Sequence, residues 1–372
     1  MAILEGEFQA YDRQIRPEDP LLRAARYAHL EVRSRLNNDE KMKPHLVADF
    51  LQGSYARHTM NNPEDMADVD IIVVTNLHEQ QWTPDQVLTM FATWLGNQYG
   101  QHRVSKNGRS VNLALDDVEV DLVPTSAPSE AVLMDYRAYS LESVAKAFQP
   151  GRQDELLDAD EVFGPSINSV SNGDWATEPL RIPDLHAECW QDTHPLAALE
   201  YTRQKNREHQ RRFLRVVRAI KWWRKRVSGG PDHPKSYPVE HMVGDACTSP
   251  FETVAEGITL TLEQMQHQYA PLYLAKRKPL LHPRGLELHP SADVLALLTD
   301  NDFCRFYEQL QVAAASARYA LGLDDPHESG KAWRRVLGDE FPVPPPGRGG
   351  PVSGGFTPRT TPAHQPRGGR FG

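Results

Sequence analysis

The chain has 372 residues, of which 24% are charged and 40% hydrophobic, values typical of a globular protein with one large domain or two smaller ones. Its net charge of -9 argues against a protein that coats nucleic acid, because such binding depends on neutralising many phosphates, and we expect no stable DNA binding. No apolar run reaches the roughly 18 residues of a membrane span. The first residues lack a signal-peptide pattern, and the three cysteines form no CxxC pair, so a reduced cytoplasmic protein without membrane contact is expected.

The N-terminal half alternates helical and strand patterns. Apolar residues recur at helical spacing in some segments, whereas others are short, apolar and β-branched. The expected elements are helices over 20–37, 39–51 (running into Gly53) and 84–99, and strands over 69–75, 109–115 and 118–123. This mixture predicts an α/β domain over residues 1–185 that includes an N-terminal helix.

The C-terminal half is predicted to be mostly helical. Helices are expected over 195–227, 238–247, 250–269, 291–298 and 302–321, which together form a helical domain over residues 186–341. Residues 342–372 contain eight prolines, eight glycines and four arginines but no acid, Leu or Ile. Such a segment lacks the side chains of a hydrophobic core, so a disordered tail is predicted.

The most informative motif is a pair of acids at the start of the predicted strand 69–75. Asp68 and Asp70 are two residues apart, so they project from the same face of a strand. Asp121, on the strand 118–123, supplies a third carboxylate, and Glu119 is a rival for that role on the same face. Clustered carboxylates repel one another unless a cation lies between them. Because Mg²⁺ prefers oxygen ligands and shares them with phosphates, the pattern predicts a Mg²⁺ site for phosphoryl transfer, with Mn²⁺ as a substitute.

Gly53 and Ser54 precede the acids and suit phosphate binding. A glycine lets backbone N–H groups approach phosphate oxygens, and the serine hydroxyl adds a donor. A Gly-Ser pair alone is uninformative, but the ordered set Gly-Ser, Asp-x-Asp and a later Asp is specific. The alternative interpretation is a polar loop beside a solvated acidic strand end.

This ordered set resembles the signature of the polymerase-β-type nucleotidyltransferases. The wider context resembles one branch, the bacterial CD-NTases, which are relatives of cyclic GMP-AMP synthase. The matching segments are 52–56 (Gln-Gly-Ser-Tyr-Ala), 120–124 (Val-Asp-Leu-Val-Pro), the basic helix around Lys205 and the pair Ser236-Tyr237. The resemblance covers about residues 20–325. It implies a bilobed α+β nucleotidyltransferase fold, with a mixed-sheet catalytic core and a helical lobe.

The resemblance also implies roles for residues outside the acidic motif. Lys221 would contact the triphosphate, Ser236 the terminal phosphates and Tyr237 the base, while Lys205 would also reach phosphate. Lys205 and Lys221 belong to the segment 203–226, which holds eleven Lys or Arg and only one acid. A solvated basic face, a helix cap at Ser236 and simple packing of Tyr237 are the alternatives.

The activity implied by the family is the joining of NTPs into a cyclic di- or trinucleotide, a second messenger that activates an effector in antiphage defence. A linear oligonucleotide synthase, a tailing or adenylylating transferase, and a catalytically silent nucleotide- or RNA-binding scaffold are the alternatives. Neither the bases nor the linkage follows from the sequence. The chain ends in Gly372 after a flexible-looking segment, which suits an acyl donor for a ubiquitin-transfer-like partner, as in some members of the family.

Overall fold

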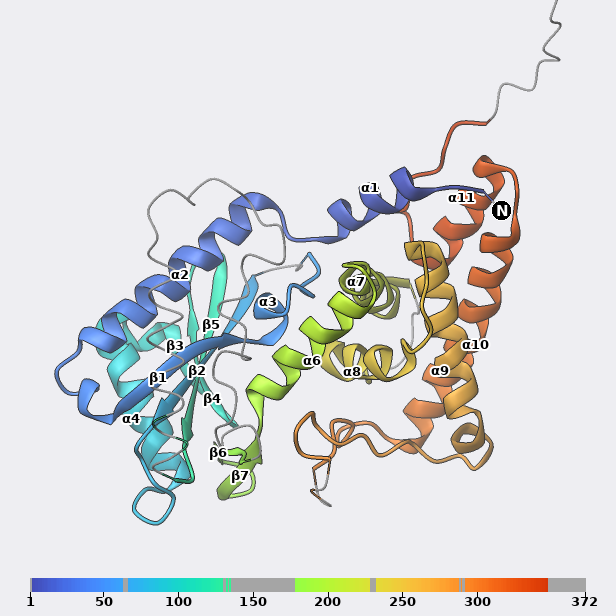
Figure 1. The fold of residues 1–372 in the computed structure, drawn as a ribbon. Helices are drawn as coiled ribbons and strands as arrows, with labels where there is room; N and C mark the ends of the chain where they lie inside the picture. Colours follow the sequence, from blue (N-terminus) through green and yellow to red (C-terminus); the bar gives the residue numbers. More distant parts are fainter. Residues whose placement is uncertain are drawn as a thin grey trace, which may run out of the picture.

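The computed structural model describes residues 2–62, 66–129, 132, 134, 178–227, 232–287, 289 and 292–346. They form two lobes, one built around a β-sheet and the other around helices, with the helix α6 (Pro195–Glu208) between them (Figure 1). Mixed sheet and helices in a bilobed arrangement confirm the expected bilobed α+β architecture. None of the helices in the described part of the chain is both long and apolar enough to cross a bilayer.

The sheet has a central parallel pair of strands with antiparallel neighbours. Strands β2 (Ala67–Thr75) and β5 (Val118–Ser126) run parallel at its centre. On one side, β1 (Leu46–Gln52) pairs with β2. On the other side, β4 (Ser110–Ala114) pairs with β5, and β3 (Val104–Asn107) pairs with β4. Strand β6 (Leu180–Asp184) pairs with the end of β5, and β7 (Cys189–Thr193) pairs with β6. Two strands that arise far apart in the sequence thus lie side by side.

The two faces of the sheet have different environments because side chains alternate along each strand. Val69 and Ile71 of β2 pack with the helices α2 (Asp19–Asn38) and α4 (Pro84–Tyr99). Ile72 and Val74 lie on the opposite face in a smaller apolar cluster. The even-numbered acids of β2 therefore project away from α2 and α4.

The helical lobe is built around a second large core. Its helices are α7 (Phe213–Trp222), α8 (Ser236–Ala246), α9 (Val254–Leu274), α10 (Asp300–Gly322) and α11 (Pro326–Leu337). The N-terminal helix α1 (Glu5–Ile15) also contributes to this core, where the ring of Phe8 meets that of Trp333 edge-on at 5.0 Å. The apolar side chains of α1 therefore pack in the core of the C-terminal lobe, while the carbonyl oxygen of Ile15 accepts from the N–H of Asn62 at 2.7 Å.

Three expected helices differ from the structure. Residues 39–51 do not form a helix but a 3₁₀ turn (Lys43–His45), followed by β1, whose pairing with β2 satisfies its backbone. The expected helix 195–227 is broken between α6 and α7, where Gln210 and Arg211 adopt positive φ values of 51° and 66°. The described residues of 291–298 form only turns.

The chain remains packed for five residues beyond the expected start of the tail. His327 Nδ1 on α11 lies 2.6 Å from the carbonyl oxygen of Pro344, and Gly330 has no room for a Cβ because Pro344 Cδ would lie 2.5 Å from it. Residues 342–346 thus lie against α11. Residues 347–372, which make up the rest of the predicted disordered tail, fall outside the described residues.

Candidate active site

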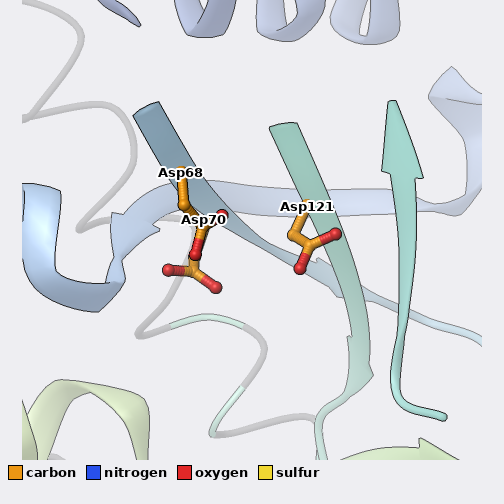
Figure 2. Close-up of side chains that lie close together, drawn as sticks. All are labelled: Asp68, Asp70 and Asp121. Atoms are coloured by element: carbon orange, nitrogen blue, oxygen red, sulfur yellow. The ribbon is translucent and has the colours of Figure 1, made fainter. Parts of the chain in front are cut away.

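The three predicted aspartates meet at the centre of the sheet. In the parallel register of β2 and β5, Asp70 lies beside Asp121 and Asp68 beside Glu119. Carboxylate oxygens of Asp68, Asp70 and Asp121 all lie within 4.8 Å of one another, and their side chains reach into the same space (Figure 2). Two oxygens on opposite sides of one Mg²⁺ are about 4.2 Å apart, so a small adjustment brings this cluster to the spacing of divalent-cation ligands.

Mutual repulsion and burial make the cluster hard to ionise without a cation. Burial first, and then the charges of Asp70, Asp121 and Glu119, raise the pKa of Asp68 to about 7. Burial and Asp121 raise the pKa of Asp70 to about 6, an effect that the cation of Arg57 opposes. Such raised values are expected where several carboxylates share a metal site, because a divalent cation supplies the missing compensation.

Asp121 is the third acid of the cluster, whereas its rival Glu119 does not belong to it. Burial raises the pKa of Asp121, while hydrogen bonds from Asn112 and Ser110 on the neighbouring strand β4 lower it. Asn112 Nδ2 donates to Asp121 Oδ1 at 3.1 Å. These bonds orient the Asp121 carboxylate, one oxygen of which belongs to the cluster. Glu119 acts at longer range, through its effect on the pKa of Asp68.

Gly53 lies against the acidic cluster, at the start of the short helix α3 (Gly53–Ala56). Its φ of 75° is a conformation that side chains rarely adopt, and an added Cβ would lie only 1.7 Å from Asp70 Oδ2. The Gly53 N–H donates to Oε1 of Gln52 at 3.2 Å. Ser54 follows on the same turn and is half-buried. The sequence therefore needs glycine here so that the backbone can approach the carboxylates of the acidic cluster.

The nucleotide-binding candidates of the helical lobe occupy two different environments. Ser236 is exposed in the first turn of α8; the capping position is Lys235, which makes no side-chain cap bond. Tyr237 is half-buried, and its ring lies 5.1 Å from the guanidinium carbon of Arg57. Tyr237 thus packs against Arg57 while part of its side chain remains exposed. Its contact with a base stays a prediction.

Both predicted phosphate-binding lysines have protein partners in the structure. Lys221 is 4% exposed, and its Nζ donates to the carbonyl oxygen of Thr59 at 2.8 Å and to Glu240 Oε2 at 3.1 Å. Lys205 Nζ donates to the carbonyl oxygen of Cys247, at the C-terminal end of α8, at 2.9 Å. The structure brings neither lysine into the acidic cluster, and their contacts with phosphate stay predictions.

Arg57 and Glu240 were not identified from the sequence, although both are buried beside the site. Arg57 Nε donates to Glu240 Oε1 at 2.7 Å, and the charge of Arg57 acts on Asp70. The cations of Arg57 and Lys221 lower the pKa of Glu240 to about 2, despite its burial. The two residues are 183 positions apart, so no local spacing could have paired them.

Comparison with known proteins gives a matching domain family and relatives over the full length of the chain. The model of the Second Messenger Oligonucleotide or Dinucleotide Synthetase domain, SMODS, matches residues 1–134. A probable cyclic AMP-AMP-GMP nucleotide synthase of Salmonella paratyphi B is 37% identical over 387 residues, which cover 99% of each chain. A cyclic AMP-AMP-GMP synthase of Enterobacter hormaechei is 35% identical, again over 99% of both chains.

Solved structures share the fold at much lower identity. The structure of CdnC from E. coli MS115-1 with ATP superimposes with a TM-score of 0.62 at 13% identity, covering 91% of this chain and 98% of that one. The acidic cluster, the glycine turn and the full-length relatives lead to one conclusion. The chain belongs to the CD-NTase family of bacterial cyclic oligonucleotide synthases and is a nucleotidyltransferase.

Proposed function

We propose that this enzyme condenses ATP and GTP into a cyclic AMP-AMP-GMP trinucleotide. The observation that carries the proposal is a cluster of three carboxylates within 4.8 Å, in a chain that is 35–37% identical over its full length to synthases of that name. A trinucleotide is one of the two ring sizes expected from the sequence. Each step is attack of a ribose hydroxyl on an α-phosphate, which forms a phosphodiester and releases pyrophosphate.

Asp68, Asp70 and Asp121 would hold the divalent cation, and the all-oxygen ligand set favours Mg²⁺ or Mn²⁺. When bound, such an ion neutralises the charge of the triphosphate and of the departing pyrophosphate. The chain itself would position the substrate: the other N–H groups at the start of α3 and the hydroxyl of Ser54 would face the phosphates, while the N–H of Gly53 donates to Gln52 Oε1. Gly53 also lets this phosphate-binding turn approach Asp70.

The helical lobe would hold the remainder of the nucleotide. Ser236, exposed at the N-terminal end of α8, offers its hydroxyl to the terminal phosphates, where the helix dipole also favours negative charge. Tyr237 provides an aromatic face for a base. Lys205 and Lys221 would add positive charge behind these groups; for Lys221 a phosphate contact requires exchange of one of its present bonds.

The product would act as a second messenger that activates an effector in antiphage defence. We further propose that a ubiquitin-transfer-like partner couples Gly372 to a target, because a terminal glycine carries no side chain and fits a narrow transfer channel. Gly372 lies outside the described residues. Mass spectrometry of the protein, isolated from cells that carry such a partner, tests this second proposal. A solely free C-terminus would refute it.

The first test of activity is incubation with four labelled NTPs and Mg²⁺ or Mn²⁺, followed by phosphatase treatment and mass spectrometry. The control is the double variant Asp68→Ala/Asp70→Ala, which removes two of the three carboxylates. A phosphatase-resistant product with two adenines and one guanine, absent from the control, is the expected result. Only phosphatase-sensitive products would indicate a linear synthase or a transferase, and a resistant product of other composition would refute the assigned bases.

A further inference from the structure

We infer that Arg57 is a positioning residue for nucleotidyl transfer. It holds the Gly53 turn and Asp70 at a fixed position relative to the helical lobe. This inference rests on the transfer reaction but not on the identity of the product. Arg57 follows α3 directly and is only 4% exposed. It thus lies four positions after Gly53, the glycine at which an added Cβ would clash with Asp70.

The guanidinium of Arg57 links three parts of the site. Its Nε donates to Glu240 Oε1 on α8 at 2.7 Å, and its Nη1 donates to Gln52 Oε1 at 3.4 Å. That same Gln52 oxygen accepts the N–H of Gly53, while Gln52 Nε2 donates to the carbonyl oxygen of Pro195 at 3.0 Å. A planar fork of donors suits such a multiple contact, which a lysine could not reproduce.

The segment after Arg57 is bound to the helical lobe as well. Thr59 Oγ1 donates to Glu240 Oε2 at 2.7 Å, and the Thr59 carbonyl oxygen accepts from Lys221. Arg218 Nη1 donates to the carbonyl oxygen of His58 at 2.6 Å. The turn that carries Gly53 is therefore anchored to β1 at one end and to α7 and α8 at the other.

This anchoring has a consequence for catalysis. Gly53 lies so close to Asp70 that a shift of the α3 turn changes the position of the carboxylate or of the phosphate-binding N–H groups. A misplacement of about 1 Å can cost on the order of 10²-fold in rate. Arg57 touches the ring of Tyr237 too, so the same side chain fixes the proposed base-stacking surface.

Arg57→Met is a suitable test because it does not leave Glu240 without partners. Glu240 retains the hydrogen bond from Thr59 and the ion pair with Lys221, so the variant should fold. Arg57→Lys restores a charge but not the simultaneous contacts with Gln52 and Glu240. The matched control is Arg33→Met, since Arg33 pairs with buried Asp49 on β1, and Asn37 remains bonded to Asp49 when Arg33 is removed.

Steady-state kinetics are measured for all three variants together with their melting temperatures. We expect Arg57→Met to lower kcat by about tenfold or more, with a change in KM for ATP below about threefold, and Arg57→Lys to recover part of the loss. Arg33→Met should lower the melting temperature without lowering kcat. A kcat within twofold of wild type in Arg57→Met, or an equal loss in Arg33→Met, would overturn the inference.

Hydrogen exchange provides a measurement that does not require turnover. The N–H of residue 57 donates to the carbonyl oxygen of Gly53 at 3.2 Å, and the N–H of Thr59 donates to that of Ser54 at 3.0 Å. We expect the protection of these two N–H groups to fall in Arg57→Met but not in Arg33→Met. Unchanged protection would refute the positioning role even if the wild-type protein formed no product. An inactive wild-type protein with the expected loss of protection would instead count against the proposed function alone.

Discussion

Replacing Gly53 by alanine tests the geometry of the whole site. The new Cβ would lie 1.7 Å from Asp70 Oδ2, so restoring an ordinary contact of 3.4 Å requires a movement of 1.7 Å (3.4 minus 1.7) by the carboxylate or the turn. Since misplacement by about 1 Å can cost on the order of 10²-fold, we expect kcat to fall by about 10²-fold or more. That loss corresponds to about 2.7 kcal/mol of transition-state stabilisation.

Gly53→Ala also strains the backbone, and this effect needs a separate control. Alanine at a φ of 75° costs about 1–2 kcal/mol in folding free energy, independently of any clash with Asp70. Gly100→Ala introduces the same type of strain at a φ of 99°, at the end of α4, where the nearest atoms belong to the side chain of His102. We expect Gly100→Ala to lower the melting temperature while leaving kcat unchanged.

Pyrophosphate release at saturating ATP and GTP, with calorimetric melting of both variants, distinguishes the two effects. Gly53→Ala should lose far more activity than its loss of stability explains. Replacing Mg²⁺ by Mn²⁺ in the assay should not restore the activity. The reasoning would be refuted by a Gly53→Ala enzyme that retains kcat within threefold of wild type. It would equally be refuted if Gly100→Ala lost as much activity.

Three further predictions concern the acids, their supporting bond and the tail. Because the pKa values of Asp68 and Asp70 are raised to about 7 and about 6, the folded metal-free protein holds protons that the unfolded chain releases near pH 4. The contribution of these two acids to stability should therefore fall as pH rises from about 4 to 7, although the lowered pKa values of the buried His29 and His58 act in the opposite direction. The increase in melting temperature on adding Mg²⁺, which reports on the acids alone, should be larger at pH 8 than at pH 5. Asn112→Ala removes the hydrogen bond to Asp121, and titration of activity with Mg²⁺ should show a loss of metal affinity of about tenfold or more. A chain that ends at Pro346 keeps every contact of the described core, so its product yield and melting temperature should match those of the full chain.

The acidic motif could be predicted from the sequence because its geometry is local. The apolar strand 69–75 and the helix 84–99 correspond closely to β2 and α4, and strand periodicity alone placed Asp68 and Asp70 on one face. The partnership with Asp121 followed once the two strands were assumed to be neighbours. The parallel register of β2 and β5 confirms that assumption.

Two elements could not be assigned correctly because tertiary contacts decide them. Residues 46–51 are rich in apolar side chains that suit a helix or a strand, and their backbone pairs with β2, a partner that lies beyond α3 in the sequence. The break between α6 and α7 depends on Gln210 and Arg211 in left-handed conformations, although neither residue type marks such a conformation. The basic run 203–226 therefore looked like one continuous helix.

The hydrogen bonds between the two lobes could not be inferred from the sequence. Glu240 is 183 residues from Arg57 and 181 residues from Thr59, and Lys221 is 162 residues from Thr59. In the sequence these are ordinary polar residues, and only paired substitutions among relatives could reveal that they touch. The acidic motif specifies which chemistry is possible, whereas these distant contacts hold the glycine turn where that chemistry can occur. A relative could therefore retain all three aspartates and still lose turnover through a single substitution at Arg57.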